Sequence, residues 1–164
     1  MNKVYTVLEN CRVCKSTDLQ EVIGIEDQFL SPTFVKTNEN NPMSNVKVPH
    51  TLMLCNDCSL LQLKETVDPD LLYREYFYRS STNDMMREDL HNVVQDVLTR
   101  VNLFPGDSVL DIGANDCTML SYFPKSLKRH GIEPAKNIDW SKVDEDIKIT
   151  FACPTEFHEF VDEH

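Results

Sequence analysis

The sequence lacks the features of membrane-spanning and secreted proteins. No apolar run approaches the roughly 20 residues that a helix needs to cross a bilayer. The first residues, MNKVY, do not lead into the long apolar core of a secretory signal. Internal repeats and low-complexity tracts are also missing. We therefore expect a cytoplasmic protein with no membrane partner.

Basic residues are scarce. The 164 residues include 16 lysines and arginines against 27 acidic residues, which gives a formal net charge of -11. Such a surface repels phosphate backbones, so nucleic acid is not an expected partner. Hydrophobic residues make up 41% and charged residues 26%, which is typical of a packed protein and not of a disordered one. The length fits one ordinary domain or two small ones.

Glycine is scarce too, with four in the whole chain. Only Gly113 follows the apolar segment Ser108–Ile112, where a Gly-x-Gly-x-x-Gly loop would place three glycines. A pyrophosphate needs several close amide donors, which such glycines make accessible. NAD and FAD are therefore not the cofactors that we expect.

Four short apolar runs in residues 1–80 predict a small β-rich module. Loop residues separate these runs, including Ser31–Thr33 and Lys36–Pro42. A module of this size has little core of its own and usually needs a structural metal or disulfides to be stable. The runs are Val4–Leu8, Glu21–Ile25, Val46–Leu54 and Leu60–Leu63.

The pattern changes to a helical period near Asn83. Apolar residues spaced three and four apart predict a helix that Thr82 or Asn83 caps and that Pro105–Gly106 stops. Strands and helices then alternate, which is typical of an α/β fold with a parallel sheet. We predict a β-rich module over residues 1–80 and a partial Rossmann-like domain over residues 81–164. The elements expected in the second part are strand Ser108–Ile112, helix Thr118–Phe123, strands Leu127–Ile132 and Ile147–Phe151, and helix Thr155–Asp162.

Two Cys-x-x-Cys pairs predict a zinc site in the β-rich module, with Cys11, Cys14, Cys55 and Cys58 as ligands. A tight turn in each pair points both thiolates inward, and four thiolates favour tetrahedral zinc. Because no position is left open, the expected role of the zinc is structural. The alternatives are buried free cysteines and a redox dithiol. A redox pair normally begins a helix after a strand, which neither pair is expected to do.

The segment VLDIGAND, residues 109–116, predicts a cofactor loop. Glu133 follows Gly113 by 20 positions, at the expected end of the next strand. A glycine permits a sharp turn and a close ligand, and the carboxylates of Asp111 and Asp116 favour a cation over a phosphate. The Glu133 carboxylate can accept both hydroxyls of a ribose. These features favour S-adenosylmethionine, which carries an ammonium and a sulfonium. The alternative is a buried strand followed by an exposed loop charge.

The order of these motifs resembles the zinc-containing sugar C-methyltransferase family. The matching pieces are CRVC from Cys11, CNDCSLLQL from Cys55, EYFYRSST from Glu75, VLDIGANDCTML from Val109 and GIEPAKN from Gly131. The resemblance implies an N-terminal zinc module, an S-adenosylmethionine-binding Rossmann fold of the class I methyltransferase type and a further C-terminal part. It also implies methyl transfer to a carbon of a nucleotide-linked deoxysugar, a small-molecule substrate.

The resemblance further implies roles for particular residues. Tyr76, with Tyr78 as second choice, would be catalytic and lie near the acceptor. The alternative is that both aromatic rings pack the linker onto the helix. Cys117 stands where the family usually has glycine. With Asp111 from the charge argument, the predicted cofactor-binding residues are Asp111, Gly113, Ala114, Asn115 and Glu133.

Two hypotheses about function remain open. The residues after the glycine loop are roughly half of what a complete methyltransferase sheet needs. The first hypothesis is therefore the N-terminal portion of a sugar C-methyltransferase, with weak or absent catalysis by this chain alone. The second is a non-catalytic, zinc-stabilised module that binds the cofactor or a partner. That partner would be a complementing chain or a second copy of this one.

Overall fold

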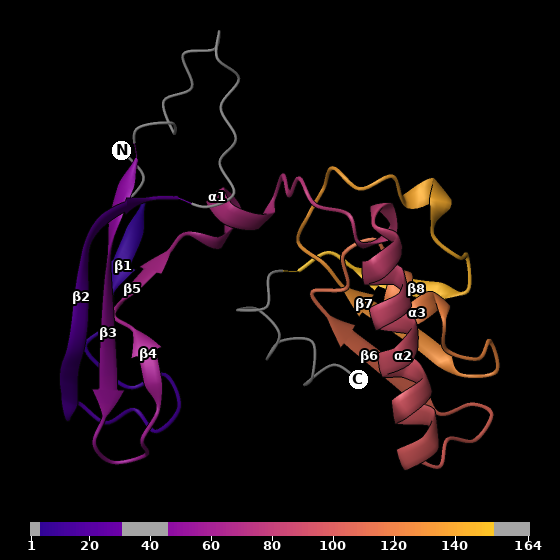
Figure 1. The fold of residues 1–164 in the computed structure, drawn as a ribbon, viewed down its shortest axis with the longest axis horizontal. Coiled ribbons are helices and arrows are strands. Elements are labelled where there is room, and N and C mark those ends of the chain that lie inside the picture. Colours follow the sequence, from indigo (N-terminus) through magenta and orange to yellow (C-terminus); the bar gives the residue numbers. More distant parts are fainter. Residues whose placement is uncertain (1–3, 31–45, 153–164) are drawn as a thin grey trace, which may run out of the picture. The chain divides into compact units, whose positions relative to one another are not determined.

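The computed structural model describes residues 4–30 and 46–152. The chain divides into two compact units, Met1–Leu72 and Tyr73–His164 (Figure 1). The loops expected at Ser31–Thr33 and Lys36–Pro42, and the helix expected at Thr155–Asp162, lie outside the described residues.

The first unit is built of antiparallel strands (Figure 1). Strand β1 pairs with β5, and a separate sheet has the order β2-β3-β4. The β-rich expectation for this part of the chain is confirmed. The strands are β1 (Tyr5–Val7), β2 (Leu19–Phe29), β3 (Lys47–Cys55), β4 (Leu61–Leu63) and β5 (Glu65–Val67), and helix α1 (Pro69–Tyr73) follows.

Two strands of this unit differ from the sequence prediction. β2 is longer than the apolar run Glu21–Ile25, because its pairing with β3 continues over polar residues through two register shifts. Its side chains are mostly exposed, so apolar periodicity could not mark its ends. β5 was missed because it begins with a carboxylate. Glu65 is buried and accepts hydrogen bonds from the backbone N–H and the hydroxyl of Thr51, at 2.9 and 3.0 Å.

The core of the first unit is small. Its buried apolar residues among those described are Leu30, Val48 and Met53, besides two cysteines. Four apolar side chains of β2 are exposed instead: Val22, Ile23, Ile25 and Phe29. Because so few apolar side chains are buried, the hydrophobic stabilisation of this unit is small. This agrees with the expectation that the module needs a structural metal or disulfides.

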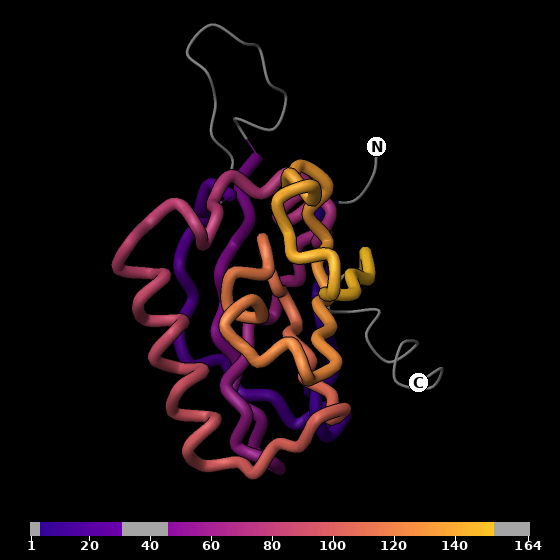
Figure 2. The backbone as a smooth tube through the Cα atoms, turned by 90° about the vertical axis from the view of Figure 1, so that its right-hand side faces the viewer, coloured from indigo at the N-terminus to yellow at the C-terminus, as the bar shows by residue number. Residues whose placement is uncertain are grey.

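The second unit is a parallel sheet in the order β6-β7-β8, with helices packed against it (Figures 1 and 2). This mixed α/β arrangement is consistent with the predicted partial Rossmann-like fold. None of the helices in the described ranges is both long and apolar enough to cross a membrane. The elements are η2 (Ser80–Thr82), α2 (Asp84–Arg100), β6 (Ser108–Ile112), α3 (Thr118–Ser121), β7 (Lys128–Ile132), η3 (Trp140–Lys142) and β8 (Ile147–Thr150).

Helix α2 supplies the longest apolar face of this unit. Asn83 is its N-cap, as predicted, and accepts hydrogen bonds from the N–H groups of Met85 and Met86. Helix α2 lies beside α3 (Figure 1), and Val94 of α2 is fully buried. The buried core of the unit is Val94, Ala114, Cys117, Leu120, Phe123, Leu127 and Ile147. Packing of this kind fixes the loop between β6 and α3.

A buried cation on β7 was not predicted from the sequence. The guanidinium of Arg129 is fully buried and donates hydrogen bonds to the Leu120 carbonyl at 3.4 Å and to Asp144 at 3.2 Å. Its Nε atom has no hydrogen-bond partner among the described residues. Lys125 also binds Asp144, at 3.0 Å, and lowers the pKa of that carboxyl. Through its contacts with Leu120 and Asp144, Arg129 links β7 to α3 and to the segment before β8.

Candidate functional site

The four cysteines of the two pairs lie together in the first unit. Their Sγ atoms are all within 4.8 Å of one another. Two Sγ–Sγ distances, Cys11 to Cys58 and Cys14 to Cys55, are 3.5 Å. Tetrahedral zinc with Zn–S bonds of ~2.3 Å places neighbouring sulfurs roughly 3.8 Å apart. The chemistry and spacing of the cluster therefore fit zinc, with a soft thiolate at every position.

The two pairs form turns of the same shape. The residue after each pair has a left-handed backbone, with φ of 64° at Lys15 and 63° at Ser59. In each turn this residue donates its N–H to the carbonyl of the first cysteine, at 3.1 and 2.9 Å. Neither turn begins a helix. This geometry is typical of metal-binding knuckles and not of a helical redox pair.

Hydrogen bonds from neighbouring residues support the first turn. Gln62 of β4 is buried and accepts a hydrogen bond of 2.9 Å from the N–H of Arg12, between the cysteines. Hydrogen bonds from the backbone of Cys14 and Val13 lower the pKa of the Cys11 thiol to about 6, against the opposing effect of burial. A hydrogen bond from the Ser16 backbone lowers the pKa of Cys14, but burial and hydrogen bonds with the other thiols outweigh it and raise this pKa to about 12, so the thiols of the cluster titrate together and not independently.

The loop after β6 has the sharp turn that the sequence predicts. Gly113 has a φ of 83°, and a Cβ atom added there would meet no heavy atom within 4 Å. The N–H groups of Gly113 and Ala114 donate to the Ile132 carbonyl, at 2.8 and 3.1 Å, and that of Asn115 donates to Glu133 at 2.7 Å. These three amides are therefore engaged within the protein, although the space beside Gly113 is open.

Two carboxylates near the ends of the neighbouring strands β6 and β7, those of Asp111 and Glu133, interact electrostatically. Glu133 is 5% exposed, and its second carboxylate oxygen accepts a hydrogen bond of 2.8 Å from the N–H of Ala135. Burial, together with the negative charge of Glu133, raises the pKa of Asp111. This edge of the sheet therefore carries negative charge in a partly buried setting, which favours a bound cation.

The segment with the two predicted tyrosines lies against the same edge of the sheet. The Tyr78 carbonyl accepts a hydrogen bond of 3.2 Å from Asn115, and the Tyr76 carbonyl accepts one of 3.2 Å from Asn137. Both tyrosines are half-buried, and their rings take part in an aromatic cluster with Phe77. The fold thus brings these tyrosines beside the loops after β6 and β7, and the ring contacts are with Phe77 of the same segment.

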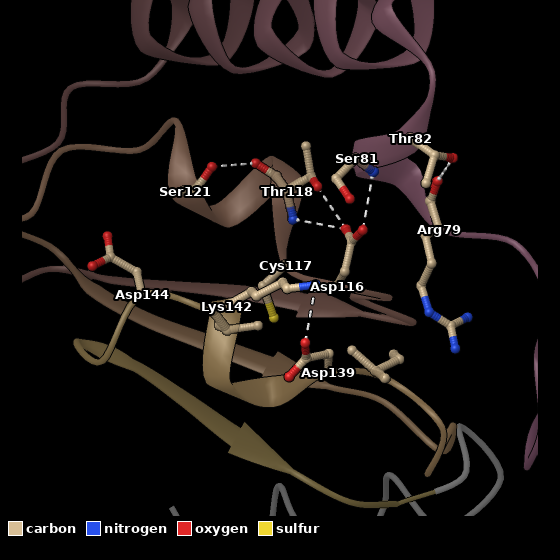
Figure 3. A pocket seen from close by; sticks show the side chains of 12 residues that line it. Arg79, Ser81, Thr82, Asp116, Cys117, Thr118, Ser121, Asp139, Lys142 and Asp144 are labelled. Carbon is tan, nitrogen blue, oxygen red and sulfur yellow. Dashed lines mark hydrogen bonds and ion pairs between the residues drawn. The ribbon is translucent and has the colours of Figure 1, made fainter.

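A cavity of about 420 Å³ lies next to the loop between β6 and α3 (Figure 3). The Asp116 carboxylate faces it and accepts hydrogen bonds from the Ser81 N–H at 3.0 Å and the Thr118 hydroxyl at 2.6 Å. None of the five predicted cofactor residues lines it. The lining residues are Arg79, Ser81, Thr82, Asp116, Cys117, Thr118, Ser121, Ile138, Asp139, Lys142, Val143 and Asp144.

Sequence reasoning missed this cavity because its walls come from three short segments without a shared motif.

Cys117 has a left-handed backbone with a φ of 60° and is buried. Burial, assisted by nearby carboxylates, raises the pKa of its thiol to about 12. Cys117 therefore acts as a small, unreactive core residue and not as a nucleophile.

Comparisons with known proteins agree with both parts of the chain. Residues 11–73 match the family model Methyltransf_13, described as "Putative zinc binding domain". The chain is also 25% identical over 139 residues to the C-methyltransferase NovU of Streptomyces niveus. That match covers 84% of this chain but 33% of the relative, so the chain spans about a third of the length of that protein. The part of the chain that holds the cysteine cluster is thus similar to a zinc-binding domain, and most of the chain is similar to a C-methyltransferase.

Proposed function

We propose that the chain carries the zinc module and the S-adenosylmethionine-binding part of a methyltransferase that acts on a carbon of a nucleotide-linked deoxysugar. The observation that carries the cofactor proposal is the pair of carboxylates, Asp111 and Glu133, beside the open space at Gly113. In open α/β sheets, ligands bind at the carboxyl ends of the strands. The C-methyltransferase relative supports a carbon as the acceptor atom, and the resemblance implies the nucleotide-linked deoxysugar.

The charge of the site decides between ligand classes. A pyrophosphate would be repelled by Asp111 and Glu133, whereas a sulfonium or ammonium would be attracted. Each Glu133 oxygen accepts one backbone N–H, and a carboxylate oxygen has a second lone pair for a ribose hydroxyl. The pair therefore suits an adenosyl cation better than a dinucleotide.

The residues then take separate roles. The zinc site would be structural, because all four ligands are thiolates. The bound cofactor would supply an electrophilic methyl group. The cofactor-binding site would consist of Asp111, Gly113, Ala114, Asn115 and Glu133. The hydroxyl of Tyr76, or of Tyr78, would hold or transfer a proton at the acceptor. We propose residues 1–80 as the zinc module, residues 81–164 as the cofactor domain and the cytoplasm as the location.

A non-catalytic role is the second candidate. β6 is an edge strand of the described sheet, and its side chains Leu110 and Ile112 are 41% and 46% exposed. An unpaired edge strand favours association, and so does an exposed apolar face, which Leu110 and Ile112 share because they are two positions apart on β6. In this case the chain would bind the cofactor, and a complementing chain or a second copy would cover that edge.

Amide chemical shifts of the zinc-loaded, ¹⁵N-labelled chain test where the cofactor binds. On addition of S-adenosylmethionine, the largest changes should fall at residues 113–117 and 133–135. Amides of β2 should not move, and NAD should cause no comparable change. Changes confined to the first unit, or none at all with S-adenosylmethionine, would refute the proposed cofactor site.

A further inference from the structure

Asn115 makes three hydrogen bonds, each through a different one of its polar groups. Its backbone N–H donates to the Glu133 carboxylate at 2.7 Å. Its side-chain carbonyl accepts from the N–H of Ser80 at 3.1 Å, and its side-chain amide donates to the Tyr78 carbonyl at 3.2 Å. One residue therefore connects the acidic end of β7 to the backbone of the tyrosine segment.

The backbone explains why asparagine suits this position. Asn115 has a φ of 50°, in the left-handed region that most residues avoid. Asparagine tolerates this region better than other residues with side chains, and it has both a donor and an acceptor. Glycine would also fit the backbone but would lose both side-chain hydrogen bonds.

A second tie holds the same segment without involving Glu133. The Arg79 guanidinium donates to the carbonyls of Tyr76 and Tyr78, and to the Asn137 carbonyl at 2.6 Å. Arg79 and Asn115 thus fasten the tyrosine segment to two different loops. Of these two residues, Asn115 also hydrogen-bonds to Glu133, a proposed cofactor-binding residue.

We propose that Asn115 is a positioning residue: it joins the Tyr76–Tyr78 segment to Glu133, so that a ligand held by Glu133 orders the tyrosines. The identity of that ligand as S-adenosylmethionine rests on the proposed function. The tie itself does not, because it is present in the protein alone. A role for Asn115 as a simple cofactor contact leaves its side-chain bonds to Ser80 and Tyr78 unexplained.

Hydrogen exchange of the zinc-loaded chain without ligand tests the tie. In Asn115→Gly the Ser80 amide loses its acceptor, and its exchange should become about tenfold faster, as expected for one lost hydrogen bond. The Ser81 amide keeps its acceptor, Asp116, and should change less. Asn92→Ala, on the exposed face of α2, is the matched control. Equal Ser80 exchange in Asn115→Gly and the wild type would overturn the inference.

Exchange with S-adenosylmethionine present tests the coupling. The ligand should slow exchange across residues 76–80 in the wild type and in Arg79→Lys, which loosens the segment but retains Asn115. In Asn115→Gly the ligand, added until the amide shifts of residues 133–135 stop changing, should no longer protect this segment, because the backbone N–H to Glu133 remains while both side-chain hydrogen bonds are lost. Equal protection in Asn115→Gly would overturn the coupling. Absence of binding to the wild type would instead refute the proposed function, while the ligand-free comparison still decides whether the tie exists.

Discussion

The N–H of Asn115 and the carboxylate of Glu133 are joined by a hydrogen bond of 2.7 Å between the loop after β6 and the end of β7. This contact spans neighbouring parallel strands, so the two motifs that the sequence places 18 residues apart form one structure. It also explains how Glu133 can be buried, since two backbone N–H groups donate hydrogen bonds to its carboxylate oxygens.

Close packing between β7 and the loop requires glycine at position 131. A Cβ atom there would lie 2.9 Å from the Cβ of Ala114 and 3.2 Å from the Sγ of Cys117. Gly131→Ala should therefore destabilise the second unit by about 1–3 kcal/mol, the usual cost of overpacking. Urea unfolding followed by the emission of Trp140 measures this directly. Gly24→Ala, on exposed β2, is the control, and equal stability of Gly131→Ala and the wild type would contradict the packing.

The left-handed turn of the second zinc knuckle predicts a matched pair of variants. Ser59 has a φ of 63°, which costs a non-glycine residue roughly 1–2 kcal/mol. Ser59→Gly should therefore bind zinc at least as tightly as the wild type, and Ser59→Val should bind more weakly. Competition with a chromophoric chelator gives both affinities. Tighter binding by the valine variant would show that the knuckle geometry is wrong.

Removal of zinc should unfold the first unit selectively. Structural zinc contributes about 10–16 kcal/mol in small peptides, far more than the few buried apolar residues of this unit. A chelator, or the variant Cys14→Ser, should collapse the amide spectrum of β2–β4 and leave Trp140 emission unchanged. Cys117→Ala should keep one zinc per chain. A first unit that stays folded without metal would contradict the structural role.

The extent of prediction from sequence follows from how each element is stabilised. The strands β6, β7 and β8 were predicted within one residue at each end, and helix α2 begins at its predicted cap, because their apolar periodicity reflects a shared core. Helix α2 ends at Arg100, before the predicted stop at Pro105–Gly106. The cysteine spacing identified the metal cluster, since few other arrangements need such pairs. Strand β5, by contrast, is held by main-chain pairing and a buried carboxylate, which leave no apolar pattern.

The site was only partly predictable for a similar reason. The glycine turn and the acidic residue are local motifs. The ties of Asn115 and Arg79 to the tyrosine segment join residues that are distant in sequence. Polar contacts of this kind depend on the folded backbone. The cavity beside Asp116 also depends on it, because its walls come from separate segments.

The raised pKa of Asp111 predicts a pH-dependent effect on stability. Burial and the charge of Glu133 raise it above the ordinary value of 3.8, so the folded state favours the protonated form. The ionised carboxylate therefore costs stability above the raised pKa, and this cost disappears below the ordinary value. Asp111→Asn should raise the Tm at pH 7 but not near pH 3, when unfolding is followed by Trp140 emission. Asp89→Asn, on exposed α2, is the control, and equal shifts at both pH values would contradict the assignment.

Calorimetric titration of the zinc-loaded chain with S-adenosylmethionine tests the proposed cofactor site most directly. One binding site per chain is expected. Glu133→Gln should weaken binding about tenfold or more, because a charge-assisted hydrogen bond is lost. Glu145→Gln, at an exposed position, should bind as the wild type does. No binding by the wild type, or unchanged affinity in a folded Glu133→Gln variant, would contradict the account.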